Sequence, residues 1–383
     1  MRFRDIIGQE GVKRRLIQSA REGRVPHAQL FAGKQGVGKM QLAMAYAQYL
    51  NCEHPMEEDS CGECPTCKQF ERMQHPDLHF TFPIVKGDAG DTCNDFADAF
   101  RGMVLEKGYF SLEDWYEAMG VENKQAIIYE KESGEIVRKL SLKAFGAGYK
   151  VMIIWQAEKM NVACANKLLK LLEEPPERTL FFLVSEMPER LLPTILSRVQ
   201  VVRVPPLQDE QVAQALMVRG VEEQKANDIA HIAQGSYLKA LQIAEDKEQN
   251  QAFMEDFVSL MRCAWLVGHK KDYASLLKLR QWSQNMADAK VGREKQKAFL
   301  QFVQKQIREN YIYNYGLPQV NYQMQEEKAF SKKFAAFIHS GNVEQIISEL
   351  DKAERQITQN GNAKMIFFDL CLQMIVLIKS FSV

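Results

Sequence analysis

The stretch Gly33-Lys34-Gln35-Gly36-Val37-Gly38-Lys39-Met40 decides the fold of the first half of this chain. It matches the phosphate-loop pattern G-x-x-x-x-G-K-[ST] at every position except the last. Residues 28–32 before it form a short apolar run, and residues 40–50 after it are almost wholly apolar and favour a helix. A strand, a glycine-rich turn and a helix in this order make half of a βαβ unit, so we expect an α/β domain with a parallel sheet.

Further apolar runs extend this pattern along the chain. Residues 150–155 and 179–184 are each associated with a helical segment and predict two more strands. Because these runs are continuous rather than alternating, we expect the parallel sheet to be buried on both faces. A last run, residues 199–204, ends at Pro205-Pro206, which we interpret as the boundary of the first domain.

After the proline pair the pattern becomes wholly helical. Residues 207–247 contain three short helical segments, and residues 248–383 show little glycine or proline and no strand alternation. The last helix is expected to carry an apolar seam at three- and four-residue spacing, made of Phe367, Leu370, Met374 and Leu377. Residues 83–149 are the least regular part of the sequence, with one helix expected near 130–145.

Composition and charge exclude some classes of protein. The 383 residues carry 49 basic and 49 acidic side chains, so bulk positive charge cannot hold this chain on nucleic acid. Residues 268–308 hold ten basic and three acidic residues, either as a solvated helix surface or as a contact for DNA phosphate. The most apolar segment, 365–378, is too short and too polar to span a bilayer of roughly 30 Å. Since no signal peptide is evident either, we expect a cytoplasmic protein with no membrane partner.

Phosphate binding is the chemistry that the glycine-rich loop would supply. Gly33, Gly36 and Gly38 let the backbone curl around one anion at the start of a helix, and Lys39 adds a charge for the outer phosphates. The last position of the pattern should ligate Mg²⁺ through a hydroxyl group, but it is Met40, whose thioether is a poor ligand for this ion. We therefore expect no Mg²⁺ binding, while ATP or ADP binding at the loop stays open.

A hydrolysing phosphate loop also needs carboxylates at the end of a second strand. One of them holds Mg²⁺ and the other polarises the attacking water. The strand predicted at 150–155 ends in Trp155 and continues with Gln156, so both carboxylates are missing. Together with Met40, these replacements predict that the chain has no ATPase activity of its own.

Four of the eight cysteines are clustered with the spacing C-x₈-C-x₂-C-x₂-C. They are Cys52, Cys61, Cys64 and Cys67. Two short C-x-x-C steps can place three thiolates around one ion, and Cys52 can complete a tetrahedral zinc site. The alternatives are an iron–sulfur cluster and four inert thiols. We favour zinc in a structural role, because four cysteine ligands leave no open coordination position.

Five motifs are spread over the first half of the chain. They are Phe3-Arg4-Asp5-Ile6-Ile7-Gly8-Gln9-Glu10, Pro26-His27-Ala28-Gln29-Leu30-Phe31-Ala32-Gly33, Ala157-Glu158-Lys159-Met160, Asn166-Lys167-Leu168-Leu169-Lys170-Leu171-Leu172-Glu173-Glu174-Pro175-Pro176 and Thr194-Ile195-Leu196-Ser197-Arg198. Together they resemble the bacterial clamp loader subunits of the AAA+ superfamily, and most closely the delta-prime family of DNA polymerase III.

The resemblance implies an organisation in three domains. A degenerate AAA+ nucleotide-binding domain is expected at 1–206, with a zinc module at 52–67 and an insertion at about 84–128. A helical lid is expected at 207–247. A helical collar, through which such subunits associate, is expected at 248–383.

The resemblance also implies a role for Arg198. Subunits of this type place the arginine of a Ser-Arg-Cys motif at the ATP held by a neighbouring subunit, so Arg198 would act as an arginine finger in trans. Here Val199 replaces the cysteine, which leaves the guanidinium group in place. The alternative is an arginine in a surface ion pair worth under about 1 kcal/mol. Leu238 stands where active subunits carry an arginine that senses the γ-phosphate of their own nucleotide.

The function implied by the resemblance is that of a structural subunit which does not hydrolyse ATP. As part of the DNA polymerase III holoenzyme, it would help to load the sliding clamp onto primed DNA during replication. Its implied partners are the delta and tau/gamma subunits and, through the assembly, the sliding clamp and primer–template DNA. Two alternatives are an active ATPase motor subunit of the tau/gamma type and a zinc-dependent nucleic-acid-binding module, and the neutral charge argues against the latter.

Overall fold

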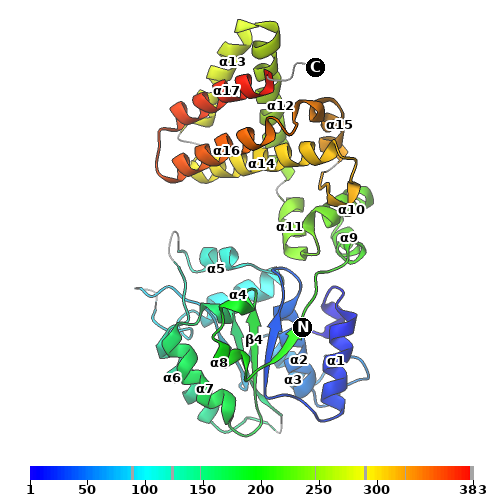
Figure 1. Cartoon of the computed structure of the whole chain (residues 1–383). Coiled ribbons are helices and arrows are strands. Elements are labelled where there is room, and N and C mark those ends of the chain that lie inside the picture. Colours follow the sequence, from blue (N-terminus) through cyan, green and yellow to red (C-terminus); the bar gives the residue numbers. More distant parts are fainter. Residues whose placement is uncertain are drawn as a thin grey trace. The chain divides into compact units, whose positions relative to one another are not determined.

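The computed structural model describes residues 1–87, 90–121, 125–146, 148–245, 247–288, 291–323 and 325–379. The chain divides into two compact units, Met1–Gln242 and Ile243–Val383, and Figure 1 labels their helices and strand β4. Parts of the predicted insertion, residues 88–89 and 122–124, lie outside the described residues. Within the described part of the chain, no helix has both the length and the apolar character needed to cross a membrane.

The first unit is built on a parallel sheet of five strands in the order β2-β3-β4-β1-β5. The strands are β1 Ala28–Ala32, β2 Leu78–Thr81, β3 Lys150–Trp155, β4 Thr179–Ser185 and β5 Gln200–Arg203. Strand β1 lies between β4 and β5, with Ala28 opposite Phe181 and Gln29 opposite Gln200. The sheet confirms the expected α/β fold of the first part of the chain.

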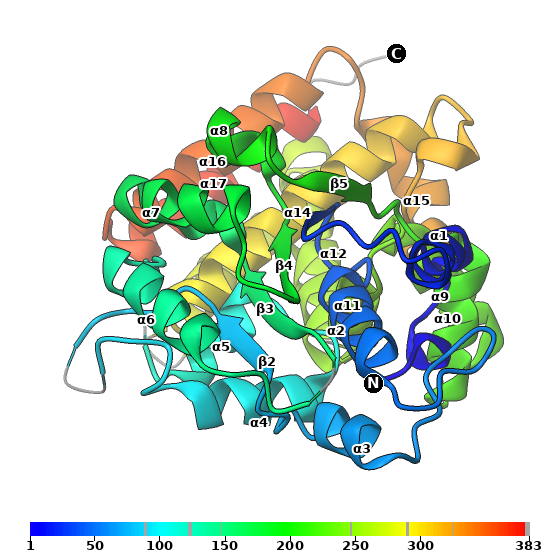
Figure 2. The same ribbon diagram turned by 90° about the horizontal axis from the view of Figure 1, so that it is seen from below.

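Both faces of this sheet are buried at its three central strands, β3, β4 and β1, as their continuous apolar runs predict. The edge strand β5, which was expected from the run at 199–204, is instead largely exposed. Alternate residues of β3 point to opposite faces, so that Val151, Ile153 and Trp155 pack into one core and Met152 and Ile154 into the other. Helices α1 Glu10–Arg21, α2 Lys39–Asn51 and α4 Ala97–Lys107 contribute to the first core. Helices α6 Glu130–Ser141 and α7 Val162–Glu173 contribute to the second, and Figure 2 shows them on the other side of the strands from α2.

The remaining elements of this unit are short. The helices are α3 Pro65–Glu71, α5 Leu112–Ala118, α8 Pro193–Leu196, α9 Asp209–Val218 and α10 Glu223–Ala233, followed by α11 Tyr237–Glu245, which extends past the boundary of the unit. Three 3₁₀ turns, η1 Phe3–Asp5, η2 Ala157–Lys159 and η3 Pro188–Arg190, connect the larger elements.

The helix expected near 130–145 is shorter than predicted. Helix α6 ends at Ser141, and Leu142 is already extended, with φ −67° and ψ 151°. The buried ammonium group of Lys150 donates hydrogen bonds to the carbonyl oxygens of Leu140 (2.5 Å) and Leu142 (3.1 Å). A positive group that takes up the last carbonyls of a helix is a favourable way to end it.

The second unit is helical throughout its described residues, as predicted. Its helices are α12 Lys247–Lys270, α13 Tyr273–Met286, α14 Arg293–Tyr313, α15 Gln325–Phe334, α16 Val343–Thr358 and α17 Ala363–Lys379, with 3₁₀ turns η4 Pro318–Val320 and η5 Ala335–Phe337. The seam expected on the last helix is present, because Phe367, Leu370 and Met374 are buried and Leu377 packs beside them.

Candidate nucleotide and metal sites

The phosphate-loop pattern lies between β1 and α2, with two of its three glycines in conformations that other residues rarely adopt. Gly36 has φ 74°, and Gly38, the residue that precedes α2, has φ 93°. Only glycine takes such angles without steric cost, so both positions depend on it. The loop starts beside β4, where the Gly33 N–H donates to the carbonyl of Ser185 (3.3 Å).

Lys39 is turned toward groups of the protein itself. Its side chain is only 5% exposed, and its ammonium group donates to the carbonyl oxygen of Lys34 (2.5 Å) and lies 3.9 Å from the carboxylate of Glu186. Burial lowers the pKa of Lys39 to about 8, against the attraction of Glu186 and Glu158. Burial also raises the pKa of Glu186. The positive charge that would face a bound phosphate is therefore directed at the Lys34 carbonyl and Glu186 of the same chain.

The positions that would serve Mg²⁺ and water activation hold buried side chains without a charge. Met40 and Trp155 are each 4% exposed and belong to the core of the first unit. The indole of Trp155 lies 5.2 Å from the ring of Phe110 and 5.7 Å from that of Phe100. Gln156 is also buried, in the left-handed conformation with φ 54°.

The first residues of helix α11 contact the phosphate loop. The N–H of Tyr237 donates to the carbonyl oxygen of Gly36 (3.0 Å). A Cβ atom added at Gly36 would come within 2.8 Å of the Cβ of Leu238 and 2.3 Å of the hydroxyl of Ser236. Leu238, which stands at the expected sensor position, is itself buried.

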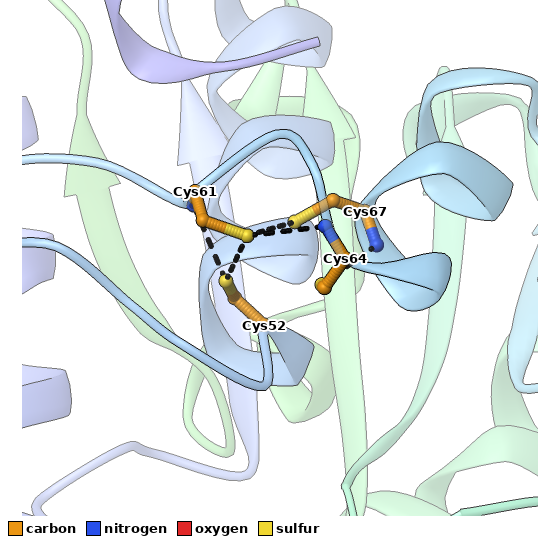
Figure 3. A group of neighbouring side chains, drawn as sticks. All are labelled: Cys52, Cys61, Cys64 and Cys67. Carbon is orange, nitrogen blue, oxygen red and sulfur yellow. Dashed lines mark hydrogen bonds between the residues drawn. The ribbon is translucent and has the colours of Figure 1, made fainter.

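The four clustered cysteines meet between the end of α2 and the start of α3, as Figure 3 shows. Cys52 follows α2, Cys64 caps the first turn of α3 and Cys67 lies within it. All four sulfur atoms lie within 4.8 Å of one another. The Cys61 sulfur is 3.5 Å from that of Cys52 and 3.8 Å from that of Cys67.

These distances and the surrounding hydrogen bonds fit a tetrahedral metal site. Zinc–sulfur bonds of about 2.3 Å place tetrahedral sulfur atoms about 3.8 Å apart. The N–H groups of Cys64 and Glu63, each 3.4 Å from the Cys61 sulfur, lower the pKa of Cys61 to about 6, because they stabilise its thiolate. Burial raises the pKa of Cys67, the opposite effect, so a bound cation would be needed to hold all four as thiolates.

The cysteine cluster is connected to the beginning of the chain. The carboxylate of Asp59 accepts hydrogen bonds from the N–H groups of Phe3 and Arg4, both at 3.0 Å. Asp59 is buried and lies two residues before Cys61. The loop between Cys52 and Cys61 therefore fixes the first turn, η1, which the sequence alone did not indicate.

Arg198 lies just after α8, with its side chain partly exposed. Its Nε donates to Glu173 (2.6 Å), with which the guanidinium forms an ion pair, and its Nη1 donates to the carbonyl of Thr194 (2.8 Å). The ion pair expected from the residues alone is thus present in this chain. The side chain is 31% exposed, so it keeps access to solvent.

Tyr109, in the predicted insertion, reaches the phosphate loop although no sequence pattern indicated it. Its hydroxyl accepts a hydrogen bond from the Ile7 N–H (3.4 Å). It would also lie 3.3 Å from a Cβ added at Gly38. Such a long-range contact depends on how the insertion folds, which composition and periodicity do not determine.

Comparison with known proteins gives a consistent set of relatives. The family described as "DNA polymerase III, delta subunit" matches residues 8–208. The delta' subunit of DNA polymerase III from Bacillus subtilis is 27% identical over 275 residues, which cover 72% of this chain and 69% of that protein. The delta' subunit from Escherichia coli is 33% identical over 184 residues, 48% of this chain and 44% of that protein.

Tau subunits are also similar to this chain. The tau subunit of DNA polymerase III from Escherichia coli is 30% identical over 249 residues, which cover 63% of this chain and 32% of that protein. The chain thus spans more than two thirds of the Bacillus delta' relative but less than half of the two Escherichia coli relatives.

Proposed function

Because this chain belongs to the DNA polymerase III delta subunit family, we propose that it acts as a delta-prime subunit of the clamp loader, one that does not hydrolyse ATP. Three relatives that are 27–34% identical carry the delta' name. The assembly would load the sliding clamp onto primed DNA during replication in the cytoplasm. The proposed partners are the delta and tau/gamma subunits and, through the assembly, the clamp and primer–template DNA.

One observation carries the proposal that the chain is not a motor. The strand end that should supply two carboxylates supplies Trp155 and Gln156, both buried, and the indole packs against Phe110. A Mg²⁺ ion would find no carboxylate at the position where catalysis needs one. This favours the structural role over an active motor of the tau/gamma type, although a tau relative is 30% identical over 63% of this chain.

The proposed domains are the three that the resemblance to clamp loader subunits implies. We assign residues 1–206 to a degenerate AAA+ domain, 207–247 to a lid and 248–383 to a collar. The four clustered cysteines would hold zinc, which supplies a rigid cross-link between α2, α3 and the start of the chain. Gly33, Gly36, Gly38 and Lys39 form a phosphate loop that has lost its catalytic partners.

Arg198 would act outside its own chain. In the assembly it would leave Glu173 and place its guanidinium beside the ATP of a neighbouring subunit, where it stabilises charge on the transferred phosphate. The exchange is inexpensive, because a partly exposed ion pair contributes about 1 kcal/mol or less.

Co-purification and ATP hydrolysis test this proposal together. We expect the chain to form a stable complex with the delta and tau/gamma subunits from the same organism. The isolated chain should release phosphate from ATP no faster than a buffer blank, with or without primed DNA. Failure to join the complex, or turnover by the isolated chain that depends on Mg²⁺, would contradict the proposal, and the latter would support the motor alternative.

A further inference from the structure

The insertion turns sharply toward the phosphate loop at the end of α4. The helix ends at Lys107, and Gly108 reverses the chain direction with φ 68°. The side-chain amide of Gln41, in the first turn of α2, donates to the carbonyl oxygen of Gly108 (2.5 Å). This bond fixes the turn against the helix that the phosphate loop introduces, so the next residue, Tyr109, is aimed at the loop.

Tyr109 contacts three separate segments at once. Its hydroxyl accepts the Ile7 N–H (3.4 Å) from the segment before α1, and it lies against Gly38 of the phosphate loop. Its ring meets that of Tyr237, the first residue of α11, edge to face at 5.0 Å. Edge-to-face pairs of aromatic rings attract each other beyond the effect of the area that they bury. The side chain thereby joins the phosphate loop to the helix packed upon it.

The insertion is held in this position by the residue that replaced a catalytic carboxylate. Phe110, next to Tyr109, packs on Trp155 at 5.2 Å, and Phe100 of α4 packs on the same indole at 5.7 Å. An aspartate at position 155 would put a charge into this aromatic cluster, at a high cost. The presence of Trp155 in place of a carboxylate and the packing of the insertion on its indole therefore depend on each other.

Three groups from other segments contact the loop. The Gln9 amide donates to the carbonyl oxygen of Val37 (3.1 Å), the Tyr237 N–H donates to that of Gly36, and Tyr109 lies over Gly38. A nucleotide whose phosphates rest on the loop N–H groups must extend its sugar and base over one of these flanks. Its charge would also meet Glu186 beside Lys39.

We propose that Tyr109 is a built-in occupant of the nucleotide site, by which the insertion replaces a bound nucleotide as the link between the phosphate loop and α11. The chain then holds this link permanently, independent of ATP or ADP. Tyr109 would hold this link in the isolated chain, whether or not the chain has its proposed place in the clamp loader.

Hydrogen–deuterium exchange and ADP titration of the full chain test the proposal. The variants are Tyr109→Ala, Tyr109→Phe and, as a matched control in the same insertion, Tyr116→Ala, whose hydroxyl accepts the Ala126 N–H instead (3.1 Å). In Tyr109→Ala, peptides covering residues 33–40 and 235–240 should exchange at least about tenfold faster, because their shared contact is lost. Tyr109→Phe keeps the ring and should stay near wild type, as should Tyr116→Ala.

The titration uses ADP with a fluorescent ribose label and unlabelled ADP as competitor. Wild type should show no saturable binding at millimolar ADP, whereas Tyr109→Ala should bind it, since the loop glycines and Lys39 remain. Saturable binding to wild type would overturn the proposal. So would a Tyr109→Ala chain that exchanges like wild type, or one that opens without gaining ADP binding.

Discussion

Lys39 occupies the lysine position of the phosphate-loop pattern, but its ammonium group contacts groups of its own chain. In a working phosphate loop its ammonium group would face phosphate oxygens, but here it faces the Lys34 carbonyl and the Glu186 carboxylate. The surrounding core withholds water from the charge, and the nearby carboxylates compensate only in part, so its pKa falls to about 8. Because burial disfavours the charged form of Lys39, the free energy of unfolding should depend on the protonation of this residue.

We predict that the free energy of unfolding rises between pH 8 and about 10.5 because of Lys39. In this window the unfolded chain binds a proton at this residue that the folded chain has lost, so stability increases with pH. The difference between wild type and Lys39→Met should grow in favour of wild type by up to about 3 kcal/mol, as measured by urea unfolding at each pH.

A matched variant separates this effect from other titrating groups. Lys34→Met removes an exposed lysine of the same loop and should follow the wild-type pH dependence. Parallel curves for wild type and Lys39→Met across the window would show that Lys39 is not held in a desolvated, charge-penalised environment.

Among the elements, the cluster of Cys52, Cys61, Cys64 and Cys67 is the part whose geometry fits a metal site. It cross-links the end of α2, the start of α3 and, through Asp59, the first turn of the chain. Phe3, Tyr49 and Phe70 from these segments are buried in the core of the first unit. A metal ion held by the four thiolates would add a further constraint on the same segments.

We predict that freshly purified chain contains one zinc ion, measured by mass spectrometry of the metal. Removal by a chelator should lower the midpoint of thermal unfolding and speed hydrogen exchange in residues 1–6 and 52–71, because the cross-link is lost. Cys64→Ser should have the same effect, whereas Cys263→Ala, in the second unit, should retain the metal. A chain that purifies with less than half an ion, or is unaffected by chelation, argues against the zinc site.

The elements that sequence predicts well are those determined by local patterns. Strands β1, β3 and β4 coincide with continuous apolar runs, because a strand buried on both faces needs apolar residues at every position. The sequence pattern does not show where α6 ends, because Leu142 and Phe145 continue the apolar pattern although they are exposed. The helix is ended by Lys150, which belongs to another element. The cysteine spacing predicted which sulfur atoms meet, whereas Tyr109 and Glu186 reach the phosphate loop through contacts distant in sequence.

At the scale of the whole molecule, the neutral charge and the division into two units suit a protein whose partners are other proteins. The positions where a motor subunit would need a hydroxyl group and two carboxylates hold the buried residues Met40, Trp155 and Gln156, while the Arg198 side chain is 31% exposed. A subunit of this kind would contribute to ATP turnover only at a site that it does not contain. Its own phosphate loop and its arginine should therefore respond differently to substitution.

The most direct measurement is the DNA-stimulated ATPase of the complete clamp loader, reassembled with variants of this chain. Arg198→Ala should lower turnover several-fold, because an arginine finger stabilises the transferring phosphate. Lys39→Met, and Arg190→Ala as an exposed control, should leave turnover unchanged, with assembly verified by size-exclusion chromatography for every variant. Loss of activity with Lys39→Met, together with full activity of Arg198→Ala, would contradict the account of a silent subunit that acts in trans.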